Sequence, residues 1–282
     1  MTPFTTLIDA RSLASLGRDD LVVVDCRFDL GDTTWGESSY SAAHIPGASY
    51  LHLDRDLSGP VTPRSGRHPL PDPESFAKRL GSIGVGNDTQ LVGYDQGSGA
   101  YAARLWWLAR WIGLASVAVL DGGIAAWRAA GLPVDQAIPT PRPRTLTPRV
   151  EPRAWLGADA IVELRVKPGN LLLDARGADR FAGRNETIDP VAGHVPGARS
   201  HPFALNLGAD GRFLDRDALR RHWLTVLGSL PPSAVVAMCG SGVTACHNLL
   251  ALEHAGLGGG RLFAGSWSEW IRDPRRPIAV GP

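Results

Sequence analysis

Short apolar runs alternate along the chain with segments in which apolar residues recur at helical spacing. The runs are rich in β-branched residues and contain few polar ones, a pattern typical of parallel strands buried on both faces. The segments between them have the spacing of crossover helices, so the alternation predicts an α/β fold with a parallel sheet flanked by helices. In the first half we expect strands at Leu21–Val24, Leu91–Tyr94 and Val117–Leu120, and helices at Leu70–Val85, Ala100–Trp111 and Ile124–Ala130.

The pattern occurs twice, with the same landmarks in the same order. "LVVVDCRFD" from Leu21 has a counterpart in "LLLDARGAD" from Leu171, and "HIPGA" from His44 has one in "HVPGA" from His194. A turn containing Gly-Ser-Gly follows in each half, and each half closes with a short aromatic segment, "LDGGIAAW" or "FAGSWSEW". Four landmarks in register make chance similarity improbable, so the chain is a tandem duplication of one domain.

A proline-rich segment separates the two copies. The stretch "IPTPRPRTLTPRVEPR" contains five prolines, which prevent a helix and favour an extended connector lying over the domain surfaces. We therefore expect a first domain at residues 1–137, a linker at 138–153 and a second domain at 154–282.

Composition narrows the class of protein. The 282 residues are 44% hydrophobic and 20% charged, which suits two globular domains. A net charge of +1 gives no reason to expect nucleic acid or an anionic membrane as a partner, and no segment resembles a signal peptide or a membrane span. The three cysteines suit neither a disulfide framework nor a zinc site, so we expect free thiols, no metal and a reducing, cytoplasmic setting.

One cysteine, Cys239, stands where an apolar run turns into the glycine-rich loop "CGSGVTA". A strand is expected at Ala234–Met238 and a helix at Val243–His254, which places the thiol at the carboxyl end of a strand, just before a helix. Gly240 and Gly242 let successive backbone N–H groups converge on one point. Such a nest and the positive end of the helix dipole both favour thiolate, so we predict a nucleophilic cysteine.

The first half provides an internal comparison. Its corresponding turn, "YDQGSGAYAAR", has Asp95 in place of the cysteine, so we expect this half to be inactive. Cys26 ends an apolar strand and Cys246 lies in the helix after the loop, and both fit a packing role. His44 and His194 belong to the Pro-Gly turn that both halves share, which indicates a structural role.

Taken together, the tandem halves, the two His-x-Pro-Gly-Ala motifs, the aspartate in the first loop and "CGSGVTA" in the second resemble a two-domain rhodanese-type sulfurtransferase. The resemblance covers nearly the whole chain, Leu21 to Ile278. It implies two parallel-sheet domains and a loop cysteine that takes sulfur from a donor as a persulfide. The persulfide then passes its outer sulfur to cyanide or to a thiol such as thioredoxin or glutathione. No bound metal or organic cofactor is implied.

Within this family, the residues after the cysteine bear on the donor. Thiosulfate-using members are similar but carry cationic residues there, whereas Gly240 and Ser241 are neutral, as in 3-mercaptopyruvate sulfurtransferases. The resemblance also implies a relay of Ser241, His68 and Asp54 that would move protons while the donor's C–S bond breaks. We therefore predict 3-mercaptopyruvate as the donor, with thiosulfate sulfurtransferase activity as the alternative.

The donor's carboxylate requires a cation, and a guanidinium can bind it through two parallel hydrogen bonds. Arg180 in "DARGADRF" matches the family's substrate-binding arginine. A second arginine usually precedes the His-x-Pro-Gly motif, but here Thr187 stands at the nearest register and Arg184, slightly earlier, is the candidate replacement. The expected loop contacts to the transferred sulfur come from the backbone of Gly240, Gly242, Val243 and Thr244.

Two other classes of protein fit less well. A cysteine phosphatase on the same scaffold needs an arginine six positions after the cysteine, where Ala245 stands. A non-catalytic persulfide carrier would need neither the relay residues nor the arginine. Release of pyruvate driven by 3-mercaptopyruvate would separate an enzyme from a carrier.

Overall fold

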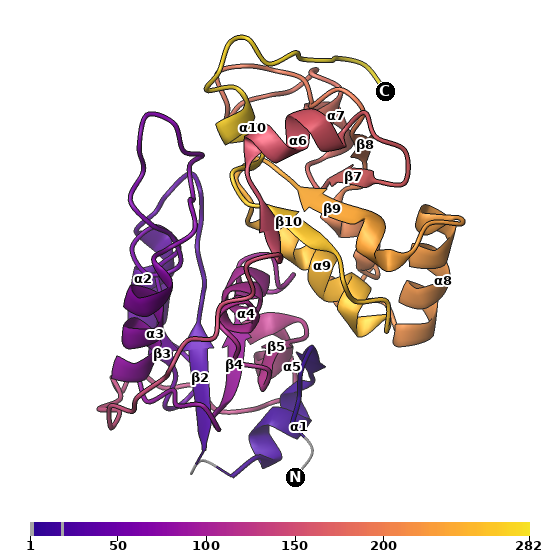
Figure 1. Cartoon of the computed structure of the whole chain (residues 1–282). Coiled ribbons are helices and arrows are strands. Elements are labelled where there is room, and N and C mark those ends of the chain that lie inside the picture. Colours follow the sequence, from indigo (N-terminus) through magenta and orange to yellow (C-terminus); the bar gives the residue numbers. More distant parts are fainter. Residues whose placement is uncertain (1–2, 18–19) are drawn as a thin grey trace. The chain divides into compact units, whose positions relative to one another are not determined.

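The protein, described by a computed structural model for residues 3–17 and 20–282, consists of two compact units, each built on its own sheet (Figure 1). The first unit comprises the chain up to Gly59 together with Pro71–Glu151 and Ala209–Phe213. The second comprises Pro60–Leu70, Pro152–Gly208 and Leu214–Pro282. Residues 60–70 of the first half of the sequence thus belong to the second unit, a grouping that the repeat does not reveal.

The first sheet has five parallel strands in the order β1-β5-β4-β2-β3. The central strands are the apolar runs expected from the sequence, and the three helices expected in this half are also present, so these predictions are confirmed. The elements are β1 Leu7–Ile8, α1 Ala10–Ser15, β2 Leu21–Asp25, α2 Trp35–Ala42, β3 Ser49–Tyr50, α3 Pro73–Ser82, β4 Gln90–Tyr94, α4 Ala102–Trp111, β5 Val117–Leu120 and α5 Gly123–Ala129.

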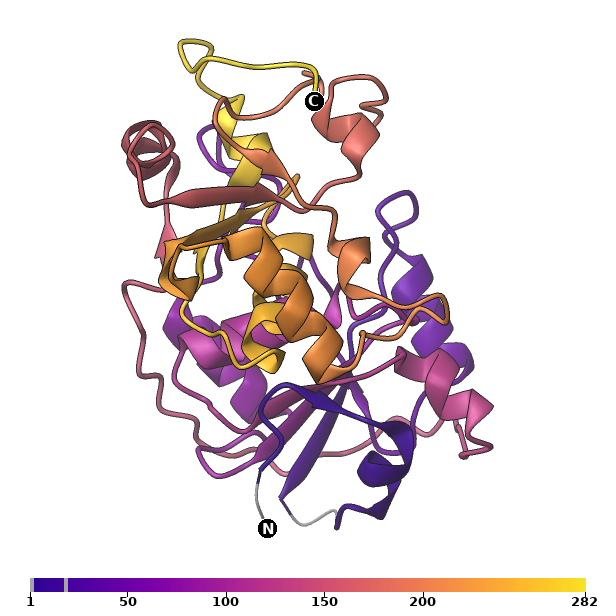
Figure 2. The same ribbon diagram turned by 90° about the vertical axis from the view of Figure 1, so that its right-hand side faces the viewer.

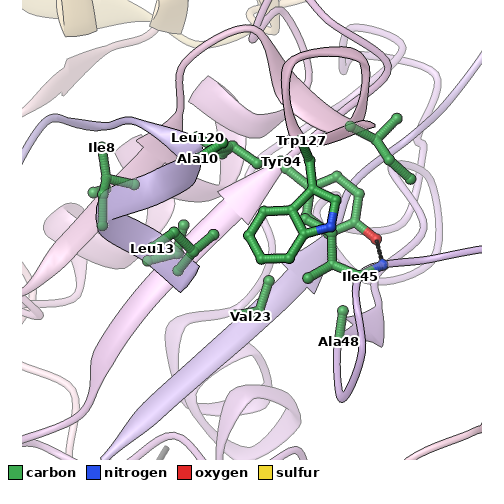
Figure 3. Packing of buried hydrophobic residues seen from close by; sticks show 12 residues of the cluster. Ile8, Ala10, Leu13, Val23, Ile45, Ala48, Tyr94, Leu120 and Trp127 are labelled. Carbon is green, nitrogen blue, oxygen red and sulfur yellow. Dashed lines mark hydrogen bonds between the residues drawn. The ribbon is translucent and has the colours of Figure 1, made fainter. Parts of the chain in front are cut away.

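Helices cover both faces of this sheet because its strands are apolar on both sides. On one face, Leu13 of α1 and Trp127 of α5 pack against Val23 and Tyr94 (Figure 3). Each large apolar side chain buried in this way contributes about 1.5–3 kcal/mol to stability. The opposite face meets α4, since a side chain on Gly93 would lie 3.1 Å from Leu105.

The second sheet repeats this topology, with five parallel strands in the order β6-β10-β9-β7-β8. Helices α8 and α9, orange in Figure 2, lie side by side, and α9 packs on β9 and β10. The elements are β6 Trp155–Leu156, α6 Ala158–Leu164, β7 Leu171–Asp174, α7 Ala178–Phe181, β8 Arg199–Ser200, the 3₁₀ helix η1 Phe203–Asn206, α8 Arg216–Leu227, the 3₁₀ helix η2 Pro232–Ala234, β9 Val235–Met238, α9 Thr244–His254, β10 Arg261–Phe263 and α10 Ser266–Trp270.

The two Pro-Gly turns are held in the same way. His44 Nδ1 is hydrogen-bonded to the carbonyl of Tyr40 at 2.7 Å, and His194 Nδ1 to that of Phe181 at 2.9 Å. Each imidazole also stacks on the aromatic ring of that partner, with centroids 4.0 Å and 3.8 Å apart. These contacts agree with the structural role expected for both histidines.

The linker, residues 138–153, contains no helix or strand, as its prolines predict. It runs along the first unit, where the N–H of Arg144 donates to the carbonyl of Gly81 at 2.9 Å and that of Arg149 to Ile112 at 2.7 Å. Within the described residues, no helix is long and apolar enough to cross a membrane.

Candidate functional site

Cys239 follows β9, a central strand that pairs with β7 and β10, and precedes α9 by a four-residue loop. It therefore lies at the carboxyl end of a parallel sheet, the edge where such sheets bind ligands. The side chain is buried, and its Sγ accepts the backbone N–H of Gly242 at 3.1 Å. The N–H groups of the first turn of α9 are not used by the helix itself. These groups and the helix dipole favour an anionic sulfur at this point.

The geometry of the loop depends on Gly242. Its φ of +79° is in the left-handed region, and a side chain there would approach the carbonyl oxygen of Ala264 to 2.1 Å. Only glycine permits both features, so the N–H that reaches Cys239 requires glycine at this position.

The backbone of the loop is fixed to the start of α10. The N–H of Cys239 donates to Ser266 Oγ at 3.0 Å, and the carbonyl of Cys239 accepts the N–H of Trp267 at 3.0 Å. The carbonyl of Gly240 accepts the N–H of Ser268 at 2.8 Å. These three bonds hold the nucleophile's backbone with little freedom, which favours a preorganised site.

The first unit shows what the same nest binds when the cysteine is absent. The Asp95 carboxylate accepts the N–H groups of Gly97 and Gly99 at 2.9 and 3.0 Å, and those of Tyr101 and Ala102 at 2.9 and 3.4 Å. Burial raises the pKa of Asp95, and these four backbone donors oppose that rise. The corresponding loop of the first unit therefore directs four backbone N–H groups at a single carboxyl group.

Of the expected relay, the structure brings two members together. His68 belongs to the second unit, is buried, and its Nδ1 is hydrogen-bonded to Ser241 Oγ at 2.7 Å. Ser241 is itself buried in the cysteine loop. Asp54 belongs to the first unit, where it is exposed and its N–H donates to His52 Nδ1 at 3.1 Å. The role of Asp54 stays a prediction.

Arg180, the expected donor-binding arginine, lies in α7 after β7 with its side chain 19% exposed. Its Nε and Nη2 both donate to the Glu186 carboxylate, the shortest of these bonds being 2.8 Å, and its Nη2 lies 3.3 Å from Asp189 Oδ2. Burial alone would raise the pKa of Glu186, but the bonds from Arg180 and from two backbone N–H groups lower this pKa below its usual value. Arg184, the other candidate, is exposed.

Two further arginines adjoin the loop and were not expected. Arg67, directly before His68, pairs with Asp189, and its Nη2 would lie 2.9 Å from a side chain on Gly240. Arg176 is buried between Asp174 and Glu186. Burial opposes its charge, but the Asp174 and Glu186 carboxylates raise the pKa of Arg176.

The other two cysteines are fully buried, consistent with packing. Burial, reinforced by the Asp25 and Asp95 carboxylates, raises the pKa of the Cys26 thiol well above its usual value. Cys246 donates from Sγ to the carbonyl of Gly242 at 3.2 Å and so supports the loop from within the helix. In the described part of the chain, no group of three or more histidine, cysteine, aspartate or glutamate side chains could hold a metal ion.

Known proteins resemble this chain over most of its length. The model of the rhodanese-like domain matches residues 8–130. A probable 3-mercaptopyruvate sulfurtransferase of Pseudomonas aeruginosa is 49% identical over 278 residues, 98% of each chain. A putative thiosulfate sulfurtransferase of Mycobacterium tuberculosis is 37% identical over 98% of this chain and 97% of its own. Among solved structures, 3-mercaptopyruvate sulfurtransferase from Leishmania major superimposes with a TM-score of 0.82 at 33% identity, covering 96% of this chain and 76% of that one.

Proposed function

The chain belongs to the rhodanese-type sulfurtransferases, and on that premise we propose that it transfers sulfur from 3-mercaptopyruvate to a thiol acceptor or cyanide through a persulfide on Cys239. The observation that carries this proposal is the sulfur of Cys239 held by the Gly242 N–H in an anion-binding loop, with His68 hydrogen-bonded to Ser241 of the same loop.

In the first step, the Cys239 thiolate attacks the sulfur of the donor. The new S–S bond forms as the donor's C–S bond breaks, and the electron pair of that bond leaves with the carbon as the enolate of pyruvate. The proton of the donor thiol moves through Ser241 and His68 to the enolate carbon, which gives pyruvate and a persulfide anion. Backbone N–H groups of the loop, Gly242 first among them, stabilise that anion.

In the second step, an acceptor thiolate attacks the outer sulfur. The proton that the acceptor thiol lost has moved to the persulfide, whose S–S bond breaks with its electron pair returning to Cys239, which restores the thiolate. Cyanide would take the outer sulfur in the same way and leave as thiocyanate. We propose thioredoxin or glutathione as the thiol acceptor in a reducing compartment such as the cytoplasm, a setting that suits three cysteines outside any disulfide.

The charges around the loop favour a donor with a single anionic group. Three arginines near the loop are ion-paired with three carboxylates, so the charges of the six side chains cancel. They are Arg67, Arg176 and Arg180 with Asp174, Glu186 and Asp189. A carboxylate adds one negative charge to this partly buried cluster, whereas thiosulfate adds two. The identity to the Pseudomonas protein supports the same donor.

The test is a comparison of initial rates with 3-mercaptopyruvate and with thiosulfate, following pyruvate and the acceptor's sulfur. We expect kcat/KM to be higher with 3-mercaptopyruvate. A clear preference for thiosulfate would overturn the donor assignment in favour of thiosulfate sulfurtransferase activity. If Cys239 instead receives its persulfide sulfur from a partner protein and no pyruvate is released, the protein is a carrier.

A further inference from the structure

The first unit contains a cavity of about 880 Å³ that is lined in part by the linker. One wall is the apolar face of the sheet, where Leu13, Val23, Ile45 and Trp127 of the buried cluster line the cavity (Figure 3). Another wall is formed by linker residues 139–144. Pockets of this volume with largely apolar walls are typical binding sites for small molecules.

The cavity lies at the amino end of the first sheet. It is lined by Leu21, Val22 and Val23, the first residues of β2, whereas Asp95 follows the carboxyl end of the parallel strand β4. Sheets of this kind bind their substrates at the carboxyl ends of the strands. All described residues that line the cavity belong to the first unit, so it is a different site from the cysteine loop of the second unit.

Part of the linker, residues 138–143, forms a strap along the cavity that is hydrogen-bonded only at its ends. Before the strap, His44 and Asp135 exchange two backbone hydrogen bonds of 2.9 and 3.0 Å, and after it the N–H of Arg144 donates to the carbonyl of Gly81 at 2.9 Å. Within the described residues, no hydrogen bond or ion pair holds the strap itself, and three of its six residues are prolines without an N–H. A further cavity of about 590 Å³ is lined by the same strap. The strap is therefore free to adjust to a bound molecule.

The charges at the cavity favour an anionic ligand. In the described part of the chain, three charged residues line it, namely Asp20, Arg142 and Arg144. Arg144 Nη1 lies 2.9 Å from Asp20 Oδ1, so these two charges cancel. Arg142, on the strap, is exposed and makes no hydrogen bond or ion pair with any described residue. One guanidinium next to an apolar wall suits a ligand with a single anionic group and an apolar body.

We propose that this cavity binds a small organic acid with an aliphatic chain, whose carboxylate pairs with the guanidinium of Arg142. The chain lies against the apolar wall, where each methylene group taken out of water raises the affinity about 4-fold. A cation of the same length would meet Arg142 with a like charge. Binding here does not involve Cys239, so its failure would leave the proposed function untouched.

The experiment is a calorimetric titration of the full chain with octanoate, hexanoate and octylammonium. We expect octanoate to bind at one site, about 10- to 15-fold more tightly than hexanoate, which has two methylene groups fewer. Octylammonium should bind about 10-fold more weakly than octanoate, because attraction to Arg142 is replaced by repulsion. Equal binding of octanoate and octylammonium, or no saturable binding of octanoate, would overturn the proposal.

Arg142→Gln tests the partner of the carboxylate. This variant should bind octanoate about 3- to 5-fold more weakly than wild type, and its affinities for octanoate and octylammonium should differ by less than about 3-fold. The matched control is Arg149→Gln, an exposed arginine of the same linker that is not among the residues lining the cavity, and it should behave as wild type. Unchanged binding in Arg142→Gln would contradict the assigned partner.

Ala14→Phe tests the place of the aliphatic chain. Ala14 is an exposed residue of α1 that lines the cavity, so a larger side chain there occupies part of the space. We expect octanoate and hexanoate to bind at least about 10-fold more weakly. Ser15→Phe, the same side chain on the next exposed residue of α1 and outside the lining, should bind both acids as wild type does. Unchanged octanoate affinity in Ala14→Phe would place the acid elsewhere on the protein and overturn the proposal.

Discussion

The hydroxyl of Ser266 accepts the backbone N–H of Cys239 at 3.0 Å while it donates to the carbonyl of Phe263 at 2.9 Å. Ser266 does so with a φ of +53°, and it is the only non-glycine residue in the described chain with a positive φ. The first unit has Gly123 at the equivalent position, with a φ of +55°. The unit that carries the cysteine thus places a side chain where its counterpart uses glycine, at a conformational cost of about 1–2 kcal/mol.

Replacing Ser266 by glycine tests whether this hydroxyl positions the nucleophile. Ser266→Gly relieves the backbone strain but leaves the buried N–H of Cys239 without its acceptor, so the effect on stability should be small. We expect kcat/KM to fall about 10-fold, because the loop loses one of its anchors. Ser266→Ala keeps the strain and loses the same bond, and should unfold at a lower temperature than Ser266→Gly. Full activity in Ser266→Gly would show that the hydroxyl has no positioning role.

The hydrogen bond between His68 and Ser241 predicts a defect that depends on the donor. Transfer of a proton to the pyruvate enolate requires the pair, whereas sulfite leaves thiosulfate without taking up a proton. We expect His68→Gln and Ser241→Ala to lower kcat with 3-mercaptopyruvate by about 100-fold. Persulfide formation from thiosulfate, followed by stopped-flow fluorescence, should change far less.

The double variant provides the control for this relay. If the two side chains act as one unit, His68→Gln/Ser241→Ala should be little slower than either single variant, because the effects of coupled residues do not add. Fully multiplicative losses would indicate that the two residues act separately. Equal losses with both donors would indicate damage to the loop.

The second unit should lose stability in mild acid because of His201. This side chain packs against Trp223 with the two rings tilted and their centroids 4.7 Å apart, and burial, with a smaller effect from His222, lowers its pKa to about 4. The unfolded chain has the ordinary histidine pKa of about 6.5, so it binds more protons than the folded protein between these values. The stability due to neutral His201 is therefore complete above about pH 6.5 and is lost as the pH falls towards 4.

Urea denaturation at pH 7 and pH 5 measures this effect. His201 should account for about 2 kcal/mol of the free energy of unfolding lost between the two values. His201→Phe keeps an aromatic ring but cannot bind a proton. The free energy of unfolding that this variant loses between the two pH values should therefore be smaller by that amount. An unchanged pH dependence in His201→Phe would show that another group is responsible.

The sequence alone was sufficient to predict the strands and helices whose pattern is local. The expected strand Leu21–Val24 is β2, Leu21–Asp25, because a buried parallel strand is an unbroken apolar run. The edge strands β1 and β3 have two residues each and leave no such run, so they could not be predicted. The placement of Pro60–Leu70 in the second unit depends on contacts with distant residues, which a repeat comparison cannot contain.

The same distinction applies to the site. Cys239 and the glycines of its loop are local in sequence and could be recognised there. Arg67 and Asp189 meet only through folding, since they are separated by 122 positions. Two signals were nevertheless present. Arg67 directly precedes the predicted relay residue His68, and the repeat places Ser266 opposite a glycine.

The most direct test of the account is the intact mass of the protein after incubation with 3-mercaptopyruvate and removal of excess donor. We predict that wild type gains the mass of one sulfur atom, that Cys26→Ala gains it too, and that Cys239→Ser does not. Peptide mapping should place the added sulfur on Cys239. A wild-type protein that gains no sulfur there, from 3-mercaptopyruvate or from thiosulfate, would contradict the central claim that this loop holds a sulfur-carrying thiolate.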